Sequence, residues 1–337
     1  MPDSSRDAAT LDLAQALQAL RLPLLQAPMF RVSSLRLARA CSAAGVIGSF
    51  QLANPRDETE LREWLDAMGA QRRVCAEQGQ GFAPYCVNVN ANSIDRAGYR
   101  ERVDLCEAAR VPLVLSSIGD PSALAARVHG WGGRIIHDVT TLRFAEKAMA
   151  AGVDGLMLTC AGAGGHNGSL SPFAFLPQVR AAGFDGLLVL AGGIADPTGL
   201  RGALALGADL VCMGTRFIAT QESEAPDAYK QMLVDAGTSD IVETDAIAGL
   251  TANWLRPSLE ANGLDPDDLP RPHRKHRPNL PEGVSAWKTV WSGGHSTGLV
   301  EDVPGVAKLV DRLEAKLAGD LETGWQATIA RRLGILE

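Results

Sequence analysis

Short apolar segments recur along the chain, and a stretch with helical periodicity follows each of them. They are continuously apolar rather than alternating, which is typical of parallel strands covered on both faces. The eight segments are residues 24–27, 46–48, 86–89, 112–115, 134–137, 155–158, 187–190 and 210–213. Several intervening stretches begin with Ser, Asp or Thr and end with Gly, the residues that cap helices. Eight strand–helix repeats predict a (β/α)8 barrel, with a doubly wound open sheet as the structural alternative.

The pattern changes after residue 217. We expect residues 1–222 to form the barrel and residues 223–284 to form a smaller, mainly helical lid segment inserted after the eighth strand. Within that region, residues 223–256 look helical. Residues 285–337 are expected to return to the barrel and to end in a helical tail. The basic cluster at 273–277 is interpreted as a solvated loop at the lid margin, and a phosphate or nucleotide contact is the alternative.

Composition is consistent with this architecture and excludes several other classes. The 337 residues fit one barrel of about 250 residues plus a smaller unit. A net charge of −7 argues against a general nucleic-acid binder. No apolar run reaches the roughly 18 residues of a membrane span, and the first twenty residues lack the features of a signal peptide. The cytoplasm is therefore the expected compartment, and a homodimer is a possible assembly.

The six cysteines form no CxxC pair, and most lie in apolar runs. This distribution predicts free, buried thiols in a reducing compartment and gives no support to a zinc site.

Small or polar residues end each predicted strand. In a barrel the carboxyl ends of all strands lie on one rim, where active sites are built. The rim residues expected from the sequence are Ala27-Pro28, Gly48-Ser49, Asn88 with Asn90, Ser116-Ser117, His137-Asp138, Thr159, Ala191-Gly192-Gly193 and Gly214-Thr215.

Two glycine turns give the strongest chemical signal. One strand leads into Ala191, Gly192 and Gly193, and the next leads into Gly214 and Thr215. Glycine allows backbone N–H groups to approach a phosphate closely, and the seventh and eighth strand ends are the usual phosphate site of this fold. We interpret the pair as a phosphate site, and two purely structural turns are the alternative.

His166 lies in a second glycine-rich loop, CAGAGGHNG, after the sixth strand. An imidazole on the functional rim can act as a base, an acid or a cationic anchor near neutral pH. At the first strand end, Pro28 stiffens the turn and Met29 offers a polarizable surface to an aromatic ring. Asn88 has the groups to hydrogen-bond a heterocycle, although Asn at a strand end is also a common turn former.

Taken together, these segments resemble the nitronate monooxygenase family, formerly called 2-nitropropane dioxygenases. The motifs that carry the resemblance are QAPM, VNVN, IIHDVT, AGAGGH, AGGIAD and GADLVCMGTRF, in that order. Two later segments, TANWLRP and VWSGGHSTGLVEDVP, are similar to a subgroup's lid and returning segment, so the resemblance covers nearly the whole chain. Flavin-dependent enoyl reductases and NADH:quinone reductases share AGGH and GTRF-like motifs.

The resemblance implies a cofactor, FMN, and a role for each matching residue. Ala27, Pro28 and Met29 line the flavin ring, Asn88 bonds its polar edge, Thr159 and Gly164 flank it, Ala191, Gly193, Gly214 and Thr215 hold its phosphate, and His166 is the catalytic histidine. The chain departs from the family at Asp138, where many relatives carry Lys. A carboxylate beside the flavin's pyrimidine carbonyls cannot supply positive charge to a reduced, anionic flavin. A second departure is His295, where relatives often carry Gln.

The implied activity is oxidation of an alkyl nitronate with O2 to a carbonyl compound and nitrite, with His166 as base or anion anchor. The nearest alternative is an FMN-dependent NAD(P)H reductase of quinones or enoyl thioesters. A flavin-free barrel acting on a sugar phosphate as a lyase or isomerase is a further alternative, and a non-catalytic binding or scaffold role is another.

Overall fold

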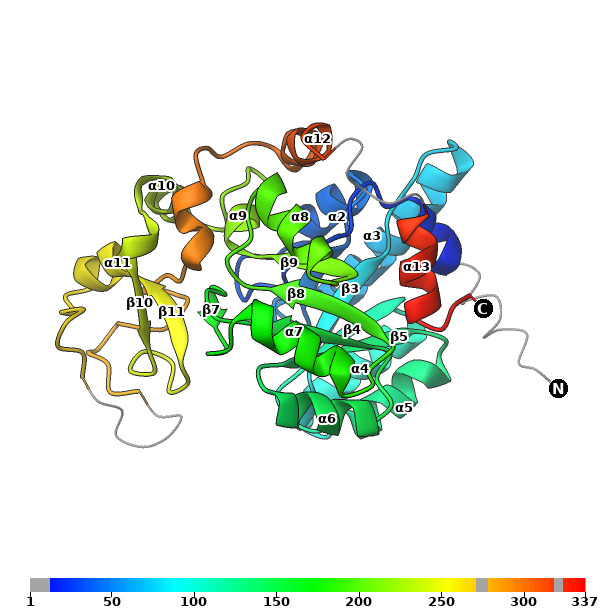
Figure 1. Cartoon of the computed structure of the whole chain (residues 1–337), viewed down its shortest axis with the longest axis horizontal. Helices are drawn as coiled ribbons and strands as arrows, with labels where there is room; N and C mark the ends of the chain where they lie inside the picture. The colour runs from blue at the N-terminus through cyan, green and yellow to red at the C-terminus, as the bar shows by residue number, and fades with distance from the viewer. Residues whose placement is uncertain (1–12, 271–277, 318–323, 337) are drawn as a thin grey trace.

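The computed structural model describes residues 13–270, 278–317 and 324–336, and it confirms the barrel. Eight parallel strands form one sheet in the order β1-β9-β8-β6-β5-β4-β3-β2 (Figure 1). A parallel bridge between Leu25 and Ile47 joins the first strand to the second and closes the ring, which excludes the open sheet. The strands are β1 Leu24–Gln26, β2 Gly48–Gln51, β3 Tyr85–Asn90, β4 Leu113–Ser117, β5 Arg134–Val139, β6 Gly155–Thr159, β8 Leu187–Ala191 and β9 Leu210–Met213.

Helices surround the barrel and begin where the sequence places capping residues. Ser34, Asp57, Thr141 and Asp196 each accept a hydrogen bond from the backbone N–H three residues further on, which satisfies a donor that the helix leaves free. The helices are α2 Leu35–Ala43, α3 Glu58–Glu77, α4 Tyr99–Ala108, α5 Ser122–Gly130, α6 Leu142–Ala150, α7 Pro172–Ala181, α8 Pro197–Ala205 and α9 Thr215–Ile218, with the 3-10 turn η1 Ala91–Ser93 after β3.

The core has two layers, one inside the barrel and one between the barrel and its helices. Alternate strand residues such as Leu113, Ile136 and Val189 fill the interior, while their neighbours pack against the helices. Helix α13, Trp325–Arg332, packs on the interior cluster from the amino ends of the strands. The barrel interior is therefore covered at the amino ends of the strands and opens at their carboxyl ends.

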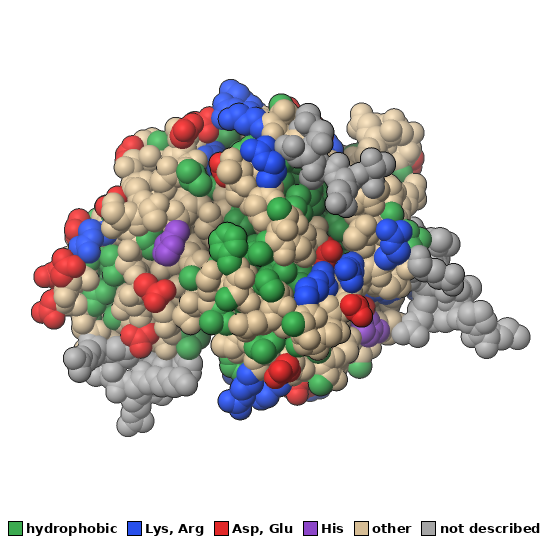
Figure 2. Space-filling model, viewed as in Figure 1, with side chains coloured by type: hydrophobic (Ala, Val, Ile, Leu, Met, Phe, Trp, Pro, Cys, Tyr) green, Lys and Arg blue, Asp and Glu red, His purple; other side chains and the backbone are tan. Residues whose placement is uncertain are grey.

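All six cysteines are free and buried, as the sequence predicted. Within the described residues, no helix is both long and apolar enough to cross a membrane. On the face shown in Figure 2, Lys and Arg side chains are interspersed with Asp and Glu, and hydrophobic side chains reach the surface in small separate groups.

An accessory segment, formed by the described residues 223–270 and 278–304, lies at the carboxyl end of the barrel (Figure 1). Its elements are α10 Asp227–Asp235, η2 Thr238–Asp240, β10 Ile241–Thr244, β11 Ala252–Leu255, α11 Arg256–Ala261 and η3 His295–Leu299. Strand β11 pairs antiparallel with β10 and with β7, Gly165–His166, from the barrel's glycine-rich loop. Helix α12, Val306–Ala315, and α13 then complete the predicted helical tail.

The expectation that residues 245–255 are helical is wrong. Strand β11 is buried along its whole length, with Trp254 and Leu255 in different apolar clusters. Backbone pairing on both edges stabilises the extended form over the helix that the local sequence favours. The accessory segment therefore combines helices with a three-stranded sheet. The basic cluster 273–277 lies outside the described residues.

The second strand is also displaced from its predicted position. It begins at Gly48 rather than ending there, so Ser49 is buried in the barrel wall and donates to the Gln26 carbonyl at 2.5 Å. Gln51 takes the place at the rim and lines the cavity there. Helix α2 packs closely against the start of this strand, because a Cβ on Gly48 would stand 2.1 Å from the Ala38 carbonyl oxygen.

Replacing Gly48 with Ala is expected to lower the free energy of unfolding by about 1–3 kcal/mol, because the barrel wall and α2 must separate. The matched control is Gly202→Ala in α8, where an added Cβ meets no atom within 4 Å. This control is expected to raise stability by about 0.5–1 kcal/mol, because glycine inside a helix is unfavourable. Urea unfolding of both variants measures the two shifts. Equal stability of Gly48→Ala and the wild type would contradict the close packing.

Candidate active site

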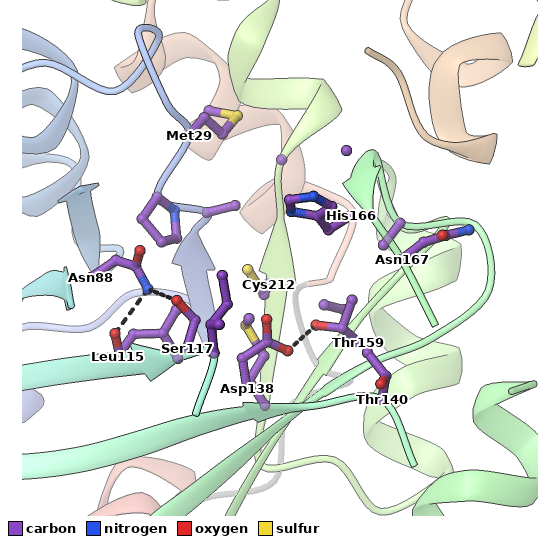
Figure 3. A pocket seen from close by; sticks show the side chains of 18 of the residues that line it. Met29, Asn88, Leu115, Ser117, Asp138, Thr140, Thr159, His166, Asn167 and Cys212 are labelled. Atoms are coloured by element: carbon purple, nitrogen blue, oxygen red, sulfur yellow. Dashed lines mark hydrogen bonds between the residues drawn. The ribbon is translucent and has the colours of Figure 1, made fainter. Parts of the chain in front are cut away.

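A cavity of about 1370 Å³ opens at the carboxyl ends of the barrel strands. It exceeds the ~300–1,000 Å³ typical of small-molecule sites. All the site residues predicted from the sequence line this one cavity, and Figure 3 shows its interior. They are Ala27, Pro28, Met29, Asn88, Asp138, Thr159, Gly164, His166, Ala191, Gly192, Gly193, Gly214 and Thr215.

The two glycine turns leave neighbouring strands at the same level, because Ala191 of β8 is paired in register with Cys212 of β9. Gly192 and Gly193 have φ angles of 130° and 70°, which L-residues with side chains rarely adopt. A Cβ added to Gly193 would meet no atom within 4 Å, so the backbone there is open to a ligand. A Cβ on Gly214 would lie 3.5 Å from the Ala27 Cβ, which brings the first strand end against the second turn.

These turns fit the phosphate of a mononucleotide. Thr215 is buried, and its Oγ1 accepts a hydrogen bond from Gly294 N–H at 3.0 Å, which leaves its own proton available as a donor. The Gly193 N–H donates to the Gly162 carbonyl at 3.2 Å and ties the turn to the glycine-rich loop. Within the described residues, no cluster of three or more His, Cys, Asp or Glu side chains is arranged to hold a metal ion.

The accessory segment holds the glycine-rich loop that carries His166. In the register of the small sheet, His166 pairs with Ala252 and Gly165 with Asn253. The fully buried Asn253 also donates from Nδ2 to the Ala163 carbonyl at 2.8 Å. Sequence reasoning noted the TANWLRP motif but derived no role for Asn253, because the pairing joins residues almost ninety positions apart.

The returning part of the accessory segment contacts the other side of this loop. His295 N–H donates to the Gly162 carbonyl at 2.9 Å, and a Cβ on Gly164 would stand 2.9 Å from Gly294 N. The imidazole of His295 is close to Gly162 but does not line the cavity among the described residues. This departure from the family therefore acts on the loop rather than directly on the cavity.

His166 reaches the cavity from the loop side. In Figure 3 it lies opposite Asn88, with Asp138 between and below them. The Trp287 ring packs edge-on against its imidazole with centroids 5.0 Å apart. The side chain is exposed at the cavity mouth, but partial desolvation by its neighbours lowers the pKa of His166 below its ordinary value, so the imidazole is mainly neutral at pH 7. Trp287 gave no signal in the sequence, since a single Trp in an irregular segment has no periodic pattern.

Two polar side chains on β3 and β5, the strands on either side of β4, have defined hydrogen-bonding roles. Asn88 donates from Nδ2 to the Leu115 carbonyl at 2.9 Å and to Ser117 Oγ at 3.3 Å, so its Oδ1 is the atom left to accept from a ligand. Asp138 accepts from Thr159 Oγ1 at 2.5 Å, and burial raises the pKa of its carboxyl to about 6. Both hydrogen-bond arrangements are visible in Figure 3.

The cavity has a second arm between the β4–α5 loop and α6. Ile118 and Phe144 line it, and each is 50% exposed. Ile118 has a φ of 57°, which is strained for a β-branched residue. Its carbonyl accepts from Asn92 N–H at 3.0 Å, which helps to hold this conformation. The arm therefore offers an apolar surface beyond the barrel mouth that the sequence did not predict.

His137, expected on the rim, faces this second arm. It is buried, its Nδ1 lies 2.7 Å from Ser116 Oγ, and burial lowers its pKa to about 4. The imidazole is therefore neutral throughout the physiological range.

Comparison with known proteins agrees with this geometry. The family whose sequence model matches the chain, over residues 12–315, is described as nitronate monooxygenase. A nitronate monooxygenase of Paraburkholderia phytofirmans is 26% identical over 89% of this chain and 93% of its own length. The solved nitroalkane oxidase from Streptomyces ansochromogenes has a TM-score of 0.69 and 26% identity, covering 90% of this chain and 97% of its own.

A third similar protein is described by a different reaction. The (3aS,4S,5R,7aS)-5-hydroxy-7a-methyl-1-oxo-octahydro-1H-indene-4-carboxyl-CoA dehydrogenase of Mycobacterium tuberculosis is 31% identical over 70% of this chain. The match spans 64% of that dehydrogenase, which is less than two thirds of its length.

Replacing Trp287 with Ala is expected to raise the pKa of His166 toward the ordinary value of about 6.5, because the desolvation contributed by the packed indole is removed. Histidine-selective NMR titration measures the shift, and loss of one resonance in His166→Gln assigns it. Trp64→Phe is the control, since Trp64 packs on Phe50 with ring centroids 5.3 Å apart and does not line the cavity. An unchanged His166 pKa in Trp287→Ala would show that the indole does not shield the imidazole.

Proposed function

The chain belongs to the nitronate monooxygenase family, and from this premise we propose that it uses FMN and O2 to oxidise alkyl nitronates to a carbonyl compound and nitrite. Family and relatives identify a flavin-dependent oxidoreductase. The observation that carries the specific proposal is the position of His166, at the mouth of the cavity that also contains two adjacent glycine turns. One cavity thereby offers both an anion site and a titratable group.

The residues present fit FMN. Backbone N–H groups at Gly214 and Thr215, with the Thr215 hydroxyl, would hold the phosphate beside the open turn at Gly193. Met29 would lie against the ring, and Asn88 Oδ1 would accept from a ring N–H. When bound, the flavin would supply the electron acceptor for the substrate and the electron donor for O2.

His166 supplies the proton chemistry. As a neutral imidazole it can remove the proton on the carbon that bears the nitro group of a nitroalkane. Toward a nitronate that is already an anion, the same side chain donates a hydrogen bond from a ring N–H. The apolar walls around it, including Trp287, limit the access of water to the reacting carbon.

A second candidate function is an FMN-dependent reductase or dehydrogenase of a thioester. The observation that favours it is the apolar arm lined by Ile118 and Phe144, which provides more space than a small nitroalkane requires. The similarity to a carboxyl-CoA dehydrogenase points in the same direction. In this reading the arm would hold the substrate's apolar body.

Substituting His166 with Ala is expected to lower kcat/KM for a neutral nitroalkane by about 100-fold or more, because the base is lost. With preformed ethylnitronate or propionate-3-nitronate the loss is expected to be smaller, about tenfold, because the variant loses one hydrogen bond to a charged group, about 1.5 kcal/mol. Nitrite release measures both. His129→Gln, on the outer helix α5 and outside the cavity, is the matched control. Unchanged turnover of both substrates by a flavin-loaded His166→Ala enzyme would refute this role.

Anaerobic titration distinguishes the two candidate functions. The purified protein is expected to be yellow and to release FMN on denaturation. Its flavin absorbance is expected to bleach on addition of nitronate and to persist with NADH or NADPH. Bleaching by a reduced nicotinamide but not by nitronate would establish the reductase instead. A colourless protein that releases no flavin would favour the sugar-phosphate barrel.

A further inference from the structure

Asp138 is an acidic side chain at the base of the cavity, on the inner side of the barrel. It follows Ile136 by two positions on β5, and Ile136 belongs to the interior cluster. Its hydrogen-bond partner among the described residues is Thr159 Oγ1. Within the same part of the chain, no Lys, Arg or His side chain forms an ion pair with it. The carboxylate therefore has little compensation for its negative charge.

The other titratable groups near Asp138 do not supply that compensation. The two nearby thiols are Cys160, just after β6, and Cys212, on β9. Burial raises the pKa values of both thiols, and the negative charge of Asp138 raises them further, so both stay neutral. The two histidines that line the cavity, His137 and His166, have lowered pKa values and are mainly neutral at pH 7.

The remaining titratable lining residues lie farther out or are uncharged. Tyr99 and Tyr229 have raised pKa values and stay protonated. Lys147 is the one Lys or Arg among the described lining residues, and it is exposed on α6 in the second arm, as is Asp120 on the β4–α5 loop. Asp138 is thus the main charge at the base of the proposed flavin site.

We propose that Asp138 takes up a proton when the bound flavin is reduced, so that the reduced enzyme holds a neutral carboxylic acid beside a negatively charged flavin. The proposal rests on the flavin site proposed above. Reduction by two electrons and one proton gives the flavin one negative charge, and a second proton converts the Asp138 carboxylate to the acid. Two electrons and two protons therefore enter together.

The physical reason is charge repulsion in a poorly hydrated site. Two negative charges at short range in a low dielectric raise the free energy of the reduced state, and protonation of one group removes that repulsion. The acid can then donate its O–H to an electron-rich flavin atom. With a pKa of about 6 before reduction, Asp138 is ionised at pH 7–8. The added flavin charge raises that pKa, so the proton is taken up in this range.

The test is the pH dependence of the flavin midpoint potential in the holoenzyme between pH 7 and 8.5. Each proton taken up with two electrons changes the equilibrium constant tenfold per pH unit, which is about 30 mV. The wild type is expected to fall by about 60 mV per pH unit, and Asp138→Asn by about 30 mV, since the amide does not titrate. Equal slopes in the two proteins would overturn the proposal.

Thr159→Val provides a second, independent variant that leaves Asp138 in place. In the wild type the Thr159 hydroxyl donates to the Asp138 carboxylate and stabilises this ionised form. Removal of the hydroxyl is therefore expected to raise the Asp138 pKa further. The pH range in which the midpoint potential falls by about 60 mV per pH unit is expected to shift to higher pH in this variant. The same pH range in the variant and the wild type would count against the proposal. Proton uptake measured with an indicator dye during anaerobic photoreduction of the wild type at pH 7.5 is expected to be two per flavin, and uptake of one would overturn it.

These measurements use a chemical or photochemical reductant, so they do not depend on the substrate. Protein that reduces normally but does not turn over nitronate would refute the proposed function and leave the Asp138 result valid. Conversely, nitronate turnover with equal slopes in both proteins would refute only the role of Asp138.

Discussion

The backbone pairing between β7 and β11 determines where the candidate catalytic imidazole stands. His166 lies in a loop with four glycines, which would sample many conformations if it were free. Pairing with Ala252 and Asn253 fixes two of its residues in extended form, and the Asn253 amide holds Ala163. An element almost ninety residues later in the chain therefore orders the loop, and the accessory segment is part of the candidate active site rather than a cover added to it.

The rest of the site follows from the closed barrel. Register between β8 and β9 places the two glycine turns side by side, and packing of α13 on the interior leaves the other end of the barrel closed. Contacts of Gly294 with Thr215 and of His295 with Gly162 then join the returning segment to both loops. A disturbance of the accessory segment would therefore reach both the second glycine turn and the loop that carries His166.

The features that could be predicted from the sequence are those that a local pattern of residues determines. All eight strands were found because continuous apolar runs between capped helices are a local signal, and the glycine turns were found because open backbone needs glycine at specific positions. Strand β11 was missed because residues 245–255 lack alternation, and their extended form depends on partners distant in sequence. Ile118 and Trp287 were missed because their importance comes from where the fold places them.

The cavity's charge balance bears on the choice of substrate. Burial keeps His137 and His166 neutral while Asp138 is largely ionised above pH 6, so the base of the cavity is negative at neutral pH. This charge raises the free energy of any anion bound near it, a nitronate included, because the one Lys or Arg among the described lining residues, Lys147, lies in the second arm. Below pH 6 that penalty falls as the carboxyl becomes protonated. A lysine at the same position would make the base of the cavity positive, and in the role proposed for Asp138 the proton that it takes up would supply the neutralisation that such a cation would give.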